Sequence, residues 1–277
     1  MESILLQVLA IIIGASIGSF LNVVVYRVPA GLSILFPPSR CPHCLKRLSP
    51  RDNIPILGWF LIRGKCRYCH TTVSWRYPAV EGLTAVLFWS VAFHFGFSQP
   101  WFVLLFYGAF LSWLLALTLI DLDTMTLPNQ LTQSGLVLGL IYQSAIAFSP
   151  NVVPYAPKLG WGSQILVGIT GAVVGIWLLD IVRWAGRFFL GKEAMGAGDA
   201  KLAAMMGAWL GWQHLLLAIL LAAFVGSLLG LFAVATRILG REQPFPFGPF
   251  LALGGALSLF WGSTIISTYL GWFGIIY

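Results

Sequence analysis

The four cysteines of the chain form two Cys-x-x-Cys pairs within one loop segment, at Cys41, Cys44, Cys66 and Cys69. Two such pairs supply four thiolates, a set of donors that suits tetrahedral Zn²⁺. The 21 residues between the pairs slightly exceed the usual spacing, but loops of this kind vary in length. We therefore expect a zinc site with a structural role, because four protein thiolates leave no coordination position for a reactive water.

Two other interpretations of the cysteines compete with zinc. Disulfides would require an oxidising compartment, and a thioredoxin-like redox site would require a βαβ pattern that the sequence lacks. The neighbouring His43 and His70 could replace a cysteine ligand, but we interpret them as exposed loop histidines. A segment of about fifty residues is too small to build much core, so metal ligation would supply part of its folding free energy.

Two aspartates adjoin apolar segments in a chain with only nine acidic residues. Asp121 ends one such segment, and Asp199 follows Gly196 and Gly198 just before Lys201. Two carboxylates that share a site cannot both ionise easily, so one keeps its proton as general acid while the other activates water. Such a pair hydrolyses amides without a metal. The glycines permit unusual backbone angles and leave room for a substrate beside Asp199.

A cation-coupled transporter that uses intramembrane carboxylates is a close rival on this chemistry alone. A dinucleotide-binding loop is disfavoured, because no predicted strand precedes Gly-x-Gly and the third glycine is missing. Asp123 would be turned about 200° from Asp121 on a continuing helix, so we expect it to lie at the membrane interface. We expect Asp180 to pair with a base such as Arg183 or to mark the interface.

A third polar group is predicted near the first apolar segment. Glu81 could face the helix bundle together with Asn22 and Arg27. Such a cluster would be structural or would face a substrate, and the structural role is slightly favoured.

The composition places these residues in a membrane protein. Of the 277 residues, 58% are hydrophobic and only 9% are charged, whereas a soluble domain carries about 25% charged residues. This excludes a soluble globular protein, and the long continuous apolar runs disfavour a transmembrane β-barrel. At about 20 residues per crossing, we predict an all-α polytopic bundle with eight spans, at 4–25, 79–97, 101–120, 131–148, 164–182, 198–212, 215–236 and 250–270. The span at 198–212 is short, and several Gly-x-x-x-Gly motifs favour close helix packing.

The basic residues predict an orientation. Nine of the sixteen lie between Arg27 and Arg76, against the single acid Asp52. Positively charged loops resist translocation, so we expect this segment, together with Asp121 and Asp199, on the cytoplasmic side and the N-terminus outside. Binding of nucleic acid is a weaker interpretation of the same charge. The run 4–25 has no preceding basic residue and exceeds a typical signal h-region, so it is interpreted as the first span.

The chain resembles the type IV prepilin peptidases, membrane aspartic endopeptidases also called prepilin leader peptidase/N-methyltransferases. The resemblance rests on the order and spacing of motifs at 18–29 (GSFLNVVVYRVP), the two cysteine pairs with 53–55 between them, 63–66, 76–81 (RYPAVE), 120–123, 127–128, 196–202 (GAGDAKL) and 246–250 (PFGPF). It implies that Asp121 and Asp199 are the catalytic aspartates, within a motif that includes Gly196, Gly198 and Lys201. One departure is Asn129, which stands where the family often has Asp.

The resemblance also implies a substrate and a second activity. The substrate would be a prepilin or pseudopilin whose short basic leader is cut on the cytoplasmic side, typically after Gly. Similar enzymes then methylate the new N-terminal residue, often Phe, with S-adenosylmethionine, and members with four cysteines are generally bifunctional. Such an enzyme lies in the bacterial inner membrane and serves type IV pili or type II secretion.

The expected organisation has three parts. These are a first span at 1–26, a zinc-binding segment linked to N-methylation at 27–78, and a transmembrane aspartic peptidase domain at 79–277. The expected partners are prepilins and the lipid bilayer, and no nucleic acid is expected. A third hypothesis, besides the enzyme and the transporter, is a non-enzymatic scaffold for a secretion or pilus assembly.

Overall fold

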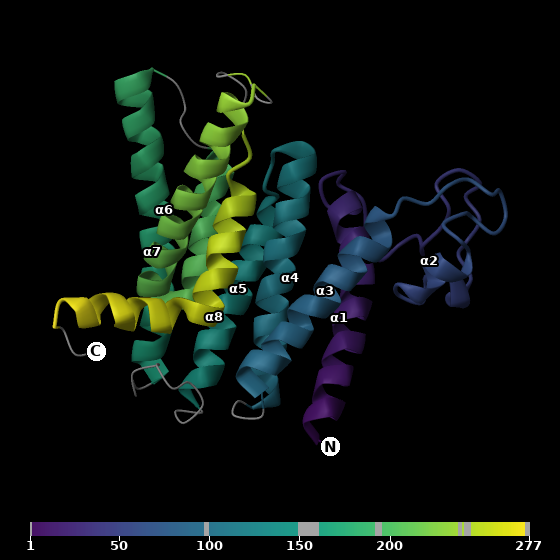
Figure 1. The fold of residues 1–277 in the computed structure, drawn as a ribbon, viewed down its shortest axis with the longest axis horizontal. Coiled ribbons are helices and arrows are strands. Elements are labelled where there is room, and N and C mark those ends of the chain that lie inside the picture. Colours follow the sequence, from purple (N-terminus) through teal and green to yellow (C-terminus); the bar gives the residue numbers. More distant parts are fainter. Residues whose placement is uncertain are drawn as a thin grey trace. The chain divides into compact units, whose positions relative to one another are not determined.

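The structure is a computed structural model that describes residues 2–96, 100–148, 161–191, 196–237, 240 and 245–274. These residues form helices and no strand, with two isolated β-bridges in the cysteine-rich segment. The predicted all-α fold is confirmed (Figure 1). The chain divides into two compact units, Met1–Ala116 and Leu117–Tyr277, each described by itself below.

The first unit is built around two long helices that pack closely on each other. α1 spans Glu2–Arg27 and α3 spans Arg76–Phe95. Gly14 of α1 permits the close contact, because a Cβ there would lie 2.8 Å from the Cα of Ala85. Small residues serve this purpose in membranes, where close van der Waals packing holds helices together. The Gly-x-x-x-Gly prediction is confirmed at this motif.

The segment between α1 and α3 contains the cysteines and two short helices. These are η1 at Pro50–Asn53 and α2 at Leu57–Leu61. The first unit ends within α4, which spans Trp101–Thr124.

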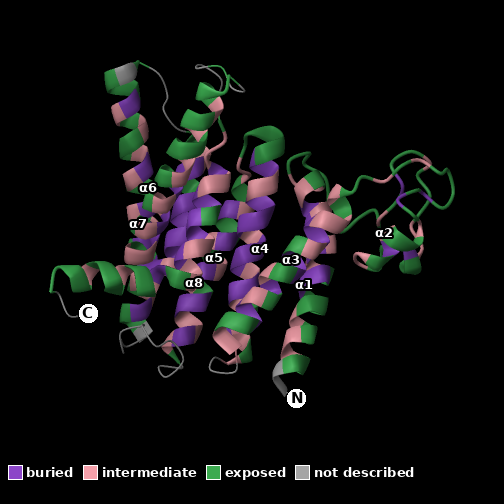
Figure 2. Ribbon diagram, viewed as in Figure 1, coloured by how far each residue is buried: buried purple, intermediate pink, exposed green. Residues whose placement is uncertain are grey.

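The second unit holds the end of α4 and four further helices. These are α5 at Asn129–Ala147, α6 at Trp161–Leu190, α7 at Ala197–Ala235 and α8 at Gly248–Trp272. Buried residues concentrate along the first half of α7 (Figure 2). Gly171 of α6 faces the backbone of Gly207 in α7, and Gly175 faces that of Ala203, so these two helices meet backbone to backbone.

The chain reverses direction within α7, at Gly211. This residue has φ 74° and ψ 169°, which are not helical. A continuous helix would place residues 199 and 226 about 40 Å apart. Instead, both residues lie near the start of α8. Asp199 interacts with Asp121, and the carboxylate of Asp121 accepts the N–H of Gly248, the first residue of α8. Gly226 lies beside Phe250, the third residue of the same helix. The two halves of α7 therefore correspond to the predicted spans 198–212 and 215–236.

Replacing Gly211 by Ala tests this reversal. An L-residue is strained at a φ of 74°, and its Cβ would lie 2.9 Å from Val167, so we expect a loss of about 1–3 kcal/mol of stability. Thermal unfolding of the detergent-solubilised protein measures the loss. Gly230→Ala is the matched control in the same helix, because no described atom lies within 4 Å of a Cβ there. Equal stability of the two variants would contradict the reversal.

Six described helices are long and apolar enough to cross a membrane: α1, α3, α4, α6, α7 and α8. With α7 divided at Gly211, seven segments match predicted spans. The eighth, predicted at 131–148, forms α5 but does not reach the same hydropathy. Its Gln143 is buried and donates a hydrogen bond to the carbonyl of Trp209, at 2.9 Å. The polarity of α5 thus serves helix packing, as polar side chains do in membranes.

Candidate active site and metal centre

The four cysteines converge in the first unit, with their sulfur atoms all within 4.8 Å of one another. The sulfurs of Cys41 and Cys69 are 3.7 Å apart, and those of Cys44 and Cys66 are 4.0 Å apart. Four thiolates at about 2.3 Å from a tetrahedral Zn²⁺ lie about 3.8 Å from one another, so the cluster fits this ion. All four cysteines are free of disulfides.

The two cysteine pairs have the same backbone conformation, repeated 25 residues along the chain. The carbonyl of Cys41 accepts the N–H of Leu45, and that of Cys66 accepts the N–H of His70, both at 2.9 Å. Leu45 and His70 have φ values of 56° and 57°. Each turn contributes two sulfur atoms to the cluster of four. In the sequence, the spacing of the cysteines is the only sign of this repeat.

The acidities of the cysteines are consistent with a bound cation. Hydrogen bonds from the side chain and backbone of Thr71 lower the pKa of Cys69 to about 6. The backbone N–H of Lys46 favours the Cys44 thiolate, yet burial and the neighbouring thiols raise the pKa of Cys44 to about 11. Four thiols this close cannot all ionise without a positive charge between them, and Zn²⁺ supplies that charge. His43 and His70 are exposed, as predicted.

The cysteine-rich segment is held by an ion pair between an exposed arginine and a buried aspartate, and by a contact to α3. Asp52 is buried and accepts hydrogen bonds from Nε and Nη2 of Arg67. Glu81 of α3 is also buried and accepts the N–H of Ile56, at 2.6 Å. These bonds fix the segment that includes α2 against the helix that follows it.

The three residues of the predicted polar cluster, Glu81, Asn22 and Arg27, each bind different backbone groups. Asn22 donates to the carbonyl of Tyr77, at 3.1 Å, and Arg27 donates to carbonyls of the loop that follows α1. These hydrogen bonds thus go to backbone groups and not from one side chain of the cluster to another. Their arrangement agrees with the structural role that the sequence favoured.

Asp121 lies in the last turn of α4, is buried, and receives a hydrogen bond from another helix. Its Oδ2 accepts the backbone N–H of Gly248, the first residue of α8, at 3.1 Å. A Cβ at position 248 would lie 2.6 Å from the same oxygen, so the contact requires glycine. The unpaired N–H groups at a helix N-terminus favour a negative charge there. The motif 246–250 was recognised in the sequence, but no role could be assigned to Gly248.

Asp199 lies in the first turn of α7, and it is buried and close enough to Asp121 for the two carboxyl groups to interact electrostatically. Its N–H donates to the carbonyl of Gly196, at 3.2 Å. A Cβ on Gly198 would meet the side chain of Leu127 at 3.0 Å, so this glycine lets the turn pack against the residues after α4.

Lys201 binds Asn129 rather than an aspartate. Its Nζ donates to Oδ1 of Asn129, at 2.7 Å, and so joins the first turn of α7 to the start of α5. The position that departs from the family pattern is therefore a hydrogen-bond acceptor next to the site.

Two further aspartates, Asp123 and Asp180, have positions predicted from the sequence. Asp123 is exposed although Asp121, two residues before it, is buried. Asp180 forms an ion pair with Arg183, at 3.0 Å, which confirms that prediction.

Two family models match successive parts of the chain. The bacterial peptidase A24 N-terminal domain matches residues 12–95, and the type IV leader peptidase family matches residues 108–231. The chain therefore has the two domains of a leader peptidase.

Curated relatives agree with this class over nearly the whole chain. A prepilin leader peptidase/N-methyltransferase of Stutzerimonas stutzeri is 38% identical over 94% of this chain and 92% of its own length. Proteins of the same name from Aeromonas hydrophila and Pseudomonas aeruginosa are each 38% identical, over 92% and 95% of this chain and 90% and 93% of their own lengths. No solved structure matches the chain. The chain belongs to the type IV leader peptidase family, and these matches do not support the transporter alternative.

Proposed function

We propose that Asp121 and Asp199 are the catalytic pair with which this membrane enzyme cuts the leader peptides of type IV prepilins or pseudopilins. Membership of the family makes the protein a leader peptidase with N-methyltransferase activity. The observation that supports the catalytic pair is the approach of two buried carboxyl groups, from the end of α4 and the start of α7.

The surroundings of the two carboxyl groups suggest their roles. The N–H of Gly248 stabilises the charged form of Asp121, so Asp121 takes a proton from water as the water attacks the scissile carbonyl carbon. Asp199 holds the other proton and donates it as the peptide bond breaks and the amine departs. The sum is hydrolysis of one amide bond, after which the pair again shares one proton.

The second activity methylates the amine that hydrolysis releases. S-adenosylmethionine is the proposed methyl donor, and residues 27–78, with Zn²⁺ at Cys41, Cys44, Cys66 and Cys69, are proposed to serve this step. Residues 1–26 would be the first span and residues 79–277 the peptidase domain. The enzyme is a multi-pass protein of the inner membrane, and we propose that its cysteine segment and catalytic pair face the cytoplasm, where the basic leader is cut.

One assay tests both activities. Purified protein in detergent is mixed with a prepilin, and the substrate mass is followed with and without S-adenosylmethionine. We expect loss of the leader in both reactions and gain of one methyl group only with the donor. An intact prepilin would refute the peptidase proposal, and a cleaved but unmethylated product would refute the methylation proposal alone.

Gly248→Ala tests the contact that holds Asp121. The added Cβ would displace the carboxylate, and misplacement by about 1 Å can cost about 100-fold in rate, so we expect a loss of that size in leader cleavage. Gly271→Ala, in the same helix with open space around its Cβ, is the control and should cleave at the parental rate. Parental cleavage by Gly248→Ala would show that this contact does not position Asp121.

A further inference from the structure

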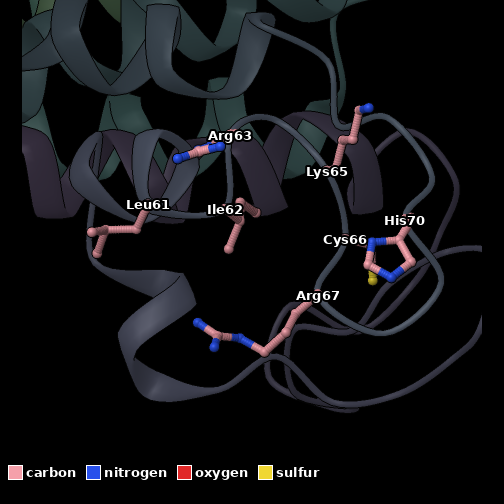
Figure 3. Close-up of a pocket in the computed structure, with 7 residues that line it drawn as sticks. All are labelled: Leu61, Ile62, Arg63, Lys65, Cys66, Arg67 and His70. Carbon is pink, nitrogen blue, oxygen red and sulfur yellow. The ribbon is translucent and has the colours of Figure 1, made fainter.

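The cysteine-rich segment contains an open cavity of about 530 Å³ beside the proposed zinc ligand Cys66. Its lining is basic and apolar, and consists of Leu61, Ile62, Arg63, Lys65, Cys66, Arg67 and His70. In Figure 3, Arg63 and Arg67 lie on opposite sides of the hollow, with Ile62 between them. The cavity therefore places cationic groups on both sides of an apolar side chain.

Most of the positive charge around the cavity is not neutralised by the protein. Arg67 is paired with Asp52, but no ion pair among the described residues involves Arg63 or Lys65. Nine basic residues and one acid between Arg27 and Arg76 give this segment a charge of +8. A Zn²⁺ ion with four thiolates lowers that charge by two, to roughly +6. The cavity therefore favours an anionic ligand.

α2 places an apolar surface beside these cations. Leu57, Phe60 and Leu61 are each at least 60% exposed, whereas Gly58 is buried against the backbone of Asp52. A helix of this size that exposes three large apolar side chains beside several cations has the composition of a membrane-surface segment. The segment is also tethered at both ends, because it joins two candidate spans, α1 and α3.

We propose that the cavity and the adjoining apolar face of α2 bind an anionic phospholipid of the leaflet that this segment faces. The phosphate of the head group lies between Arg63 and Arg67, with Lys65 adding positive charge nearby. Leu57, Phe60 and Leu61 enter the boundary between head groups and acyl chains. Basic residues near an anionic membrane surface and apolar side chains at that depth both favour this arrangement.

Neither of the ligands proposed above, S-adenosylmethionine and a basic leader peptide, fits the cavity as well. S-adenosylmethionine has a net positive charge, because its sulfonium and amino groups outweigh its one carboxylate, and Asp52 is already bound to Arg67. A basic leader peptide would be repelled by the same cations. An anionic lipid satisfies both the charge and the exposed apolar side chains.

Amide hydrogen exchange of residues 57–67 tests the proposal on the full protein in nanodiscs. Protection is compared between phosphatidylcholine alone and phosphatidylcholine with increasing phosphatidylglycerol. We expect protection to rise with the anionic lipid. The variant Arg63→Gln/Lys65→Gln loses two charges, each worth about 1 kcal/mol near an anionic surface. It should therefore need about thirty times more phosphatidylglycerol to reach half of the full protection. That amount exceeds what a nanodisc can contain, so we expect no protection in this variant. Arg40→Gln/Arg47→Gln removes the same charge away from the cavity and should behave as the parent.

Three outcomes would overturn the proposal. Equal exchange in the two lipid mixtures would exclude binding of anionic lipid at this segment. Equal loss of protection in both double variants would mean that the protection depends on the total charge of the segment and not on the cavity. Protection by inorganic phosphate or glycerol phosphate in phosphatidylcholine nanodiscs would make the cavity a site for a soluble anion. Zinc content verifies that each variant is folded, and the leader-cleavage assay is independent of the result.

Discussion

Asp121→Asn and Asp199→Asn should each reduce the rate of leader cleavage by about 10²–10⁴-fold. An amide cannot take the proton that the attacking water loses, nor donate the proton that the leaving amine needs, and each of these roles contributes about 10²–10⁴-fold. Both side chains are buried, and Asn preserves their size, so the fold should persist. Single-turnover cleavage of a prepilin, followed by mass, measures the loss.

Two other aspartates supply matched controls for these variants. Asp123→Asn changes an exposed carboxylate two residues after Asp121, and Asp180→Asn changes one that is paired with Arg183 in α6. Both controls should cleave at close to the parental rate, and all four variants should retain zinc. Parental activity in Asp121→Asn or Asp199→Asn would remove that residue from the proposed mechanism.

Cys66→Ser should release the metal and unfold the cysteine-rich segment. Structural zinc sites contribute about 10–16 kcal/mol of apparent binding free energy at neutral pH, far more than a segment of this size gains from its own core. Cys66 is a buried member of the cluster, and a serine hydroxyl is a poor substitute for its thiolate. We expect the bound zinc to fall from one per chain to none and amide exchange of residues 28–75 to become fast.

The same variant separates the two proposed activities. Methylation should be lost with the folded segment, whereas leader cleavage should persist, because both aspartates belong to the second unit. His43→Ser is the control, since His43 is exposed beside the cluster but not part of it. Retention of zinc by Cys66→Ser, or its loss from His43→Ser, would mean that the ligands are assigned wrongly.

The sequence predicted the elements of this fold better than their contacts. Continuous apolar runs located the long helices, because the bilayer imposes both their length and their composition. It also predicted two helical segments, at 198–212 and 215–236, although the structure places the break at Gly211, within the first of these ranges, and joins the two helices there without a loop. The polar character of α5 was underestimated, since only the structure reveals that its Gln143 binds the backbone of Trp209.

The side chains of the candidate site could be predicted from the sequence, but the backbone group that binds Asp121 could not. Carboxylates and thiols are scarce enough in this chain to be noticed by type and position. The N–H of Gly248, however, is 127 residues from Asp121 and carries no chemical signature in the sequence. The hydrogen bond between Lys201 and Asn129 spans 72 residues and was equally invisible. Glu81 was assigned the wrong partners for the same reason, because its acceptor role toward Ile56 depends on how a loop folds back onto α3.

A double-mutant cycle tests most directly whether the two aspartates act as one catalytic unit. Single-turnover leader cleavage is measured for the parent, for each Asp→Asn variant and for Asp121→Asn/Asp199→Asn. If the two carboxyl groups share one reaction, removal of the second costs little once the first is gone, so the double variant should cleave about as slowly as either single variant. Losses that multiply in the double variant would instead mean that Asp121 and Asp199 act independently, which would contradict the proposed catalytic pair.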